Sequence, residues 1–316
     1  MSDEIRVGVS TCLLGERVRH DGGHKRDAFV TETLAPYIRF VPVCPEVEIG
    51  LGIPREAIHL LRRAGEIRLV GVESGRDHTE AMTSFARRRV AELAALDLSG
   101  YILKKDSPSC GVERVAIHLA DGRKERKGRG LFASALRERL PVLPVEEEGR
   151  LQDPKLRENF IERVFAYRRV KTLFAERWTA ADLVRFHSRE KMLLLVHDRS
   201  RTVALGRWIA AMHARSRAEI ARGYTEGFLS ALEKIATRGR HADVLAQMAG
   251  FLRGTVDAGS RRELASLIED YRKGGVPLVV PLTLIRHHVR ARAIEYLAGQ
   301  SYLEPHPHEL MLRNQV

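Results

Sequence analysis

The chain contains three cysteines, and each stands just beyond a short apolar run that is typical of a β-strand. Cys12 follows IRVGVS, Cys44 ends RFVPVC, and Cys110 lies a few residues after YILKK. In an open α/β sheet, ligands and reactive groups gather at the carboxyl ends of the strands. We therefore expect the three thiols to meet at one point and to form a three-thiolate site whose fourth position is open.

Three thiolates favour soft metals, namely zinc, copper(I) or iron–sulfur clusters. A structural zinc site usually has paired cysteines two to four residues apart, and this chain has no such pair. Isolated cysteines that a sheet brings together suit a cubane iron–sulfur cluster better, and an iron without a protein ligand can act as a Lewis acid. The alternative is three ordinary buried cysteines. A sparse, odd set argues against disulfides and for a reducing cytoplasm.

Acidic and hydroxyl side chains accompany the cysteines. Glu46 and Glu48 closely follow the second cysteine. Near a metal-bound substrate, Glu46 could orient a water molecule or relay a proton, or it could be a solvated loop acid, which is the stronger interpretation for Glu48. Ser107 and Ser109 precede the third cysteine in DSPSCG. Their hydroxyls could bond a bound base or a cluster sulfur, or they could cap the next turn.

The elements that must position these residues alternate in type over the first half of the chain. Strand-like runs also occur at IRLVGVE and PVLPVEE, and helix-like stretches lie between the strands. This alternation predicts an α/β domain over residues 1–150, with a mostly parallel, Rossmann-like sheet and helices on both faces.

A polar hinge at residues 146–154 separates this domain from an all-α domain at residues 151–316. The apolar periodicity predicts helices near residues 154–176, 180–198, 201–212, 218–237, 241–251, 260–273, 281–299 and 309–314. The stretch GGVPLVVPL (274–282) is expected to be an extended connector, because two prolines exclude an interior helix there.

The formal net charge of +12 is unevenly shared between the two halves. Residues 1–150 hold 25 Lys and Arg against 23 Asp and Glu, and residues 151–316 hold 28 against 18. The basic second half favours a polyanionic partner, above all nucleic acid, unless its arginines merely solvate the surface. No run is long enough to span a membrane and no secretory signal is present, so we expect a cytoplasmic protein.

Two further patterns are weaker. The loop DGRKERKGRG (121–130) combines five Lys and Arg with a helix N-terminus, which favours phosphate. His187, Glu190 and His197 have the residue types of a zinc site, but no second feature supports one, and we expect a polar structural network. Basic residues of a later helix either contact phosphates or form its wet side: Arg286, His287 and Arg290.

The stretches CLLGERVRHDGG, CPEVEIGLGIPRE, KKDSPSCG and GRGLFASAL resemble the thiouracil desulfidase (TudS) family over most of residues 5–145. The resemblance implies a [4Fe-4S] cluster held by Cys12, Cys44 and Cys110, whose free iron takes the sulfur of a thiolated pyrimidine. It also implies that Glu46 and one serine of the SPSCG motif assist the chemistry.

Residues 160–316 resemble the YbgA-type helical domain through FHSREKMLLLVH, HADVLAQMAGFL, PLVVPLTLIRHHVR and YLAGQSYLEPHPHELMLRN. The combination is similar to the RudS type of desulfidase, which implies non-redox release of hydrogen sulfide from 4-thiouridine in tRNA. The alternative is an enzyme for free thiouracil or thiolated uracil nucleosides, with the helical domain serving oligomerisation. An RNA-binding module with a structural metal and a cysteine-nucleophile hydrolase are the remaining possibilities.

Overall fold

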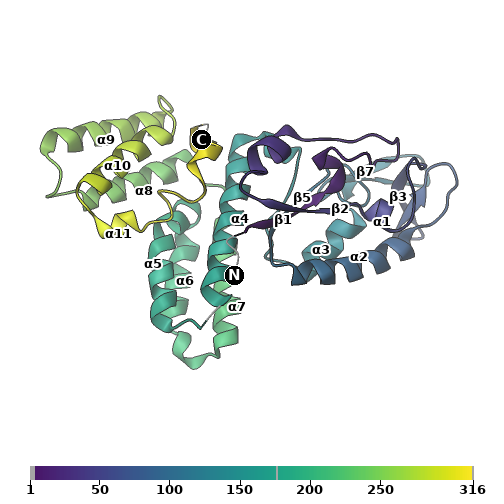
Figure 1. The fold of residues 1–316 in the computed structure, drawn as a ribbon, viewed down its shortest axis with the longest axis horizontal. Helices are drawn as coiled ribbons and strands as arrows, with labels where there is room; N and C mark the ends of the chain where they lie inside the picture. Colours follow the sequence, from purple (N-terminus) through teal and green to yellow (C-terminus); the bar gives the residue numbers. More distant parts are fainter. Residues whose placement is uncertain (1–3, 176, 315–316) are drawn as a thin grey trace. The chain divides into compact units, whose positions relative to one another are not determined.

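The structure, a computed structural model, describes residues 4–175 and 177–314. It divides into two compact units, Met1–Gln152 and Asp153–Val316, each with its own buried core (Figure 1). The division falls two residues after the boundary that the sequence pattern predicts.

The main sheet of the first unit is parallel throughout. Its strands lie in the order β2-β1-β5-β8, with bounds β1 (Arg6–Ser10), β2 (Arg39–Val43), β5 (Leu98–Leu103) and β8 (Val145–Glu147). Every residue of β5 is buried, which explains why this strand reads as an apolar run. Gly8 of β1 pairs with Tyr101, and a Cβ at Gly8 would lie 2.2 Å from the tyrosine ring. The predicted mostly parallel α/β fold is confirmed.

A second, mixed sheet has the strand order β4-β3-β6-β7. Its bounds are β3 (Ile58–Arg63), β4 (Glu66–Gly71), β6 (Val115–His118) and β7 (Lys124–Gly128). The prediction of a loop throughout residues 121–130 was therefore wrong, because β7 is a strand. Residues 120–122 form a three-residue hairpin loop between Leu119 and Arg123, and Gly122 takes the left-handed conformation that such a loop needs, with a φ of +82°. β7 escaped the sequence analysis because a charged edge strand has no apolar alternation.

Helices pack against the parallel sheet of the first unit (Figure 1). The α-helices are α1 (Pro45–Glu48), α2 (Thr79–Ala95) and α3 (Leu131–Arg139), and shorter helical turns are η1 (Thr11–Leu14), η2 (Phe29–Leu34) and η3 (Arg150–Gln152). Phe132 of α3 contacts both Phe85 of α2 and Tyr101 of β5, at ring-centroid distances of 6.4 and 5.9 Å. These contacts pack α3 against β5 and α2, and α3 in turn positions one of the cysteine loops.

The described residues of the second unit form helices joined by turns and loops, with no strand among them. Its α-helices are α4 (Pro154–Ala175), α5 (Ala180–His197), α6 (Arg199–Ala210), α7 (Arg217–Leu232), α8 (Arg238–Phe251), α9 (Ala258–Lys273), α10 (Val279–Ala291) and α11 (Glu295–Ala298). Short turns complete it: η4 (Met212–Ala214), η5 (His308–Leu310) and η6 (Leu312–Asn314). No helix among the described residues has the length and apolar content needed to cross a bilayer.

Two sequence expectations for this unit were wrong. Residues 279–282 are not an extended connector, because α10 begins at Val279 and Pro281 occupies its first turn. A proline is tolerated there, since the first N–H groups of a helix have no intrahelical acceptor. The single helix expected at 281–299 is instead interrupted at Ala293, which has a φ of +49°.

Candidate active site

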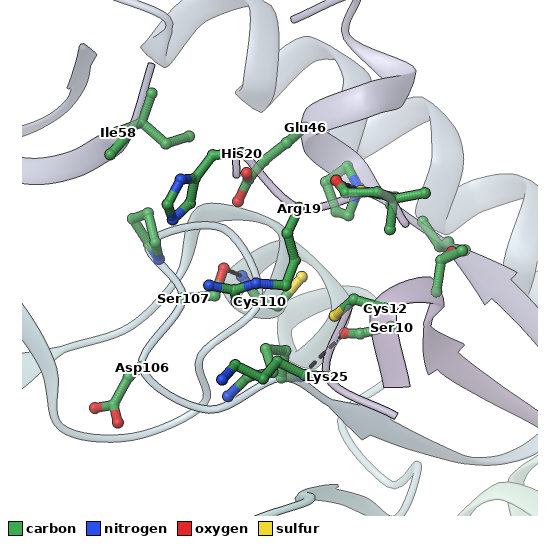
Figure 2. A pocket seen from close by; sticks show the side chains of 18 of the residues that line it. Ser10, Cys12, Arg19, His20, Lys25, Glu46, Ile58, Asp106, Ser107 and Cys110 are labelled. Atoms are coloured by element: carbon green, nitrogen blue, oxygen red, sulfur yellow. Dashed lines mark hydrogen bonds between the residues drawn. The ribbon is translucent and has the colours of Figure 1, made fainter. Parts of the chain in front are cut away.

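A cavity of about 330 Å³ opens at the carboxyl ends of β1, β2 and β5, and all three cysteines line it. Cys12 lies in η1, directly after β1, and Cys44 follows the last residue of β2. Cys110 lies in the loop beyond β5. Figure 2 shows the sulfur atoms of Cys12 and Cys110 among the side chains that surround this cavity. The topology thus brings together residues almost a hundred positions apart, as the sequence pattern predicts.

Backbone hydrogen bonds hold the first two cysteine loops in place. The carbonyl oxygen of Cys12 accepts from the N–H of Lys25 at 2.9 Å, which folds residues 13–25 back over η1. Cys44 caps α1, and its own N–H donates to Oε1 of Glu48 at 3.1 Å. Glu48 therefore anchors the Cys44 loop, and its other oxygen pairs with Arg89 at 3.2 Å.

The third cysteine loop sits on the N-terminus of α3. The N–H of Leu131 donates to the carbonyl of Pro108 at 3.2 Å, and the N–H groups of Phe132 and Ala133 donate to that of Ser109. A Cβ at Gly130 would lie 2.4 Å from the Ser109 backbone, so this approach requires glycine. The helix N-terminus that the sequence suggested for phosphate is thus occupied by the chain itself, and it positions the Cys110 loop instead.

The two serines of this loop have different surroundings. The hydroxyl of Ser107 lines the cavity and accepts from the N–H groups of Ser109 and Cys110, at 3.2 and 3.0 Å. Because it accepts twice from the backbone, its own proton remains available for donation. Ser109 is fully buried and donates to Oε1 of Glu46 at 3.1 Å. Ser107 therefore caps the turn and faces the cavity, whereas Ser109 orients Glu46.

Glu46 projects into the cavity from the first turn of α1 (Figure 2). Its side chain is 16% exposed, so it is not the solvated loop acid of the alternative interpretation. Oε2 pairs with Arg55 at 2.6 Å, while Oε1 receives the Ser109 hydroxyl. Arg55 also donates to the carbonyls of Gly52 and Val18, at 2.8 and 3.0 Å. The carboxylate is thus fixed by contacts from two other loops, as a general base or a water-orienting group requires.

Burial raises the pKa of each cysteine thiol. The pKa of Cys12 rises to about 11, because burial and then the neighbouring Cys44 disfavour the thiolate. Burial likewise raises the pKa of Cys44, and it raises that of Cys110 well above the usual range. At neutral pH the three groups are therefore neutral thiols, and a metal that binds them must displace their protons.

Cationic side chains predominate in the cavity lining. Five cations face two carboxylates: Arg19, Lys25, Arg55, Lys104 and Lys105 against Glu46 and Asp106. Lys104 pairs with Glu148 at 2.6 Å, and Arg19 approaches Asp21 at 3.4 Å. The sequence analysis missed Arg55 and Lys104. Arg55 lies nine positions after Glu46, within the stretch CPEVEIGLGIPRE. That stretch has no periodicity, so only the closeness of Arg55 to Cys44 and Glu46 in the sequence could have marked it as a site residue.

Among the described residues of the second unit, no three His, Cys, Asp or Glu side chains are grouped to hold a metal ion. His197 bonds Glu162, Glu190 forms a two-point contact with Arg169, and His187 bonds Tyr224. Each side chain thus has its own protein partner, which confirms the polar structural network and excludes the zinc-like grouping. Two arginines of α10, Arg286 and Arg290, both pair with the carboxylate of Glu304, at 2.7 and 3.5 Å.

The first unit is an α/β domain whose parallel sheet carries three cysteine loops at one edge, and comparison with known proteins gives its family. A family described as 2-thiouracil desulfurase matches residues 7–148, and a protein family of unknown function (DUF1722) matches residues 191–307. The chain belongs to the 2-thiouracil desulfurase family and joins that domain to a YbgA-type domain.

Three known proteins are similar to parts of this chain. The uncharacterized protein YbgA of Escherichia coli (strain K12) is 31% identical over 153 residues, which are 48% of this chain and 90% of that protein. The uncharacterized protein YbbK of Bacillus subtilis (strain 168) is 32% identical over 135 residues, which are 41% of this chain and 88% of that protein. A solved [4Fe-4S]-dependent thiouracil desulfidase, TudS, is 32% identical and matches 47% of this chain and 94% of its own, with a TM-score of 0.39.

Proposed function

We propose that the protein is an iron–sulfur-dependent desulfidase that converts 4-thiouridine in tRNA to uridine and releases hydrogen sulfide. The observation that carries this proposal is the cavity at the sheet edge, which three thiols and the fixed carboxylate of Glu46 share. The matched desulfurase family supports the reaction class. The excess of Lys and Arg in the second half of the chain supports an RNA substrate.

The donor set fits a cluster by its chemistry, because three thiols line one cavity and thiolates are the ligands of iron–sulfur clusters. Lys104 and Arg19 lower the pKa of Cys12 against the effect of burial, so they favour a negatively charged sulfur ligand. Cys12, Cys44 and Cys110 would hold a [4Fe-4S] cluster here. When bound, this cluster would supply a Lewis-acidic iron for the thiocarbonyl sulfur.

The chain's own residues then supply the acid–base chemistry. Glu46, fixed by Arg55 and Ser109, takes a proton from a water molecule whose oxygen adds to C4 of the thiolated base. The Ser107 hydroxyl, which faces the cavity, donates a hydrogen bond to the sulfur as the C4–S bond breaks. Glu46 then returns this proton to the sulfur as the C4–S bond breaks, and the added hydroxyl loses its own proton and becomes the C4 carbonyl. One water is consumed and uridine and hydrogen sulfide are formed, so the reaction is a hydrolysis. No electrons are transferred, and no external reductant is needed.

Bulk tRNA that contains 4-thiouridine provides the test. The full chain, reconstituted with iron and sulfide without oxygen, is incubated with this tRNA and, separately, with 4-thiouridine as a free nucleoside. We expect the 4-thiouridine content of the tRNA to fall while sulfide appears in equal amount. Turnover of the nucleoside with intact thiolation of the tRNA would instead support the free-base enzyme.

A further inference from the structure

Four helices of the second unit meet at one end, which we name the arginine end and define as residues 177–185 and 207–222. It contains the first turns of α5 and α7, the last turn of α6, and η4. In Figure 1 these turns lie at the bottom of the picture, next to the last turn of α4. Phe174 of α4 contacts Trp178 and Tyr224, at ring-centroid distances of 5.1 and 6.1 Å, and thereby ties α4 to this end.

The arginine end concentrates positive charge. It carries six arginines, all exposed, against two carboxylates: Arg177, Arg185, Arg207, Arg215, Arg217 and Arg222 against Asp182 and Glu219. Both carboxylates are engaged in capping boxes, Asp182 with Thr179 and Glu219 with Ser216. These hydrogen bonds lower the pKa of both acids, which therefore stay ionised at neutral pH. Four positive charges remain uncompensated within these ranges. The neighbouring acid, Glu176, lies outside the described residues.

Two of the arginines stack on the chain's two tryptophans. The guanidinium of Arg217 lies 4.9 Å from the ring centroid of Trp178, and that of Arg215 lies 5.1 Å from that of Trp208. Gly223 makes room for the second stack, because a Cβ there would come within 2.9 Å of the Trp208 ring. One backbone carbonyl holds each guanidinium: that of Trp178 for Arg217 and that of Ala211 for Arg215. A stacked guanidinium is pre-oriented and still has N–H donors for an anion.

The charge on α9 contrasts with this arrangement. Arg272 pairs with Asp243 at 2.8 Å and with Glu269 at 3.5 Å, and Lys273 also pairs with Glu269. Cations near the end of α9 are therefore compensated by acids of α8 and α9, whereas the arginine end has one such pair, Arg185 with Asp182, and keeps four more cations than carboxylates. An uncompensated group of exposed arginines next to aromatic rings favours nucleic acid.

We infer that the arginine end is the surface with which this unit binds the phosphate backbone of RNA. The inference rests on the proposed action on tRNA and deepens it, because it names the contact residues. Arginine forks match phosphate oxygens in two-point contacts, and each contact releases a counterion from the RNA. Binding of this kind weakens as salt rises and depends little on base sequence.

Binding of bulk tRNA to the full-length, metal-free chain tests this surface without relying on catalysis. The variant carries Arg215→Gln and Arg217→Gln. The matched control carries Arg261→Gln and Arg262→Gln, two exposed positions on α9, and loses the same charge. Dissociation constants are measured by fluorescence anisotropy at several salt concentrations. We expect affinity to fall roughly tenfold and the slope of log K against log salt to fall by about 2, while the control stays near wild type.

A second pair, Arg207→Gln with Arg222→Gln, separates lost charge from a disturbed tryptophan stack, because neither residue is one of the two stacked arginines. It should weaken tRNA binding in the same way. Turnover of free 4-thiouridine by the reconstituted variants should remain unchanged. Equal losses in the α9 control, or wild-type binding in both arginine-end variants, would overturn the inference and leave the desulfidase proposal intact. A wild-type chain that binds no tRNA would overturn the inference together with the proposed RNA substrate.

Discussion

The two units bury their polar groups in opposite ways. In the second unit, Arg313 bonds Glu158 and Glu162 at 3.0 Å each, and His197 bonds Glu162 at 2.8 Å. The cavity beside them measures only about 20 Å³. In the first unit, three thiols line a cavity of about 330 Å³. A buried network in which every polar group has a hydrogen-bond partner stabilises the fold, whereas buried thiols around an open cavity are typical of a ligand-binding site.

Electrostatics sharpen the contrast. Burial opposes ionisation of Glu162, but His197 and Arg313 overcome this effect and lower the pKa of Glu162. Burial also opposes protonation of His197, yet Glu162 raises the pKa of His197. The thiols of the first unit have no comparable compensation, and burial raises their pKa. The buried charges around Glu162 are therefore paired within the protein, whereas the three thiols would ionise only with a bound metal.

The largest effect is expected from the cysteines. Cys12→Ala should abolish turnover of thiolated uracil by the reconstituted protein, because the cluster loses a ligand. It should lower the free energy of unfolding by only about 1 kcal/mol, as for a typical buried substitution. Sulfide release and urea unfolding measure the two quantities. Retained turnover would remove Cys12 from the site, and the same test applies to Cys44 and Cys110.

Glu46→Gln should reduce kcat by roughly 10²- to 10⁴-fold, the usual contribution of a positioned general base. Its matched control is Glu48→Gln, because Glu48 bonds the Cys44 N–H and Arg89 and does not line the cavity. The iron content of both variants should equal that of the wild type. If the two glutamine variants have equal turnover, Glu46 has no special part in the reaction.

The second unit should respond to a broken pair with lost stability. Arg313→Met leaves Glu158 and Glu162 without their shared cation, and it should cost about 3–5 kcal/mol. Both tryptophans, Trp178 and Trp208, lie in this unit, so their fluorescence reports its unfolding separately from that of the first unit. Turnover of free 4-thiouridine should remain, and a loss below about 1 kcal/mol would contradict a supporting role for the network.

A smaller effect on the stability of the second unit is expected at acidic pH. Since the pKa of Glu162 is lower in the folded protein than in the unfolded chain, its stabilising contribution is present above about pH 4.3 and is lost as the pH falls further. The wild type should therefore lose more stability between about pH 5 and pH 3.5 than the double variant Glu162→Gln with His197→Gln, which removes the carboxylate together with the histidine whose pKa it raises. Urea unfolding followed by tryptophan fluorescence measures this difference. Identical pH profiles would show that the carboxylate contributes nothing through its charge.

Much of the first unit could be predicted from the sequence because its parallel strands are continuous apolar runs. Cys12 and Cys44 directly follow two of these runs and Cys110 lies a few residues after a third, so their meeting was predicted from their positions beyond strand ends. The second sheet was not, because β7 is charged along its length and its hairpin is marked only by Asp121-Gly122. The first turn of α10 was missed because Pro281 was read as a helix breaker, although the first turn tolerates it.

The roles of the residues around the cysteines were harder to predict from the sequence. Glu46 and the two serines stood beside cysteines, but only the structure separates Ser107 at the cavity from Ser109 behind Glu46. No pattern indicates that Arg55 reaches Glu46, because an ion pair within an irregular loop depends on how the loop folds rather than on spacing. The phosphate predicted at the N-terminus of α3 was also wrong, because the N–H groups of this helix end donate to the backbone of the chain's own Cys110 loop.

Dependence of turnover on the cluster is the most direct test of the site described above. One preparation is divided in two, and one half is loaded with iron and sulfide without oxygen while the other stays metal-free. Both receive 4-thiouridine, and uridine and sulfide are quantified. The loaded half should bind about four irons per chain and form uridine and sulfide in equal amounts, whereas the metal-free half should form neither. Uridine formation at the same rate by the metal-free half would contradict the three-cysteine cluster site.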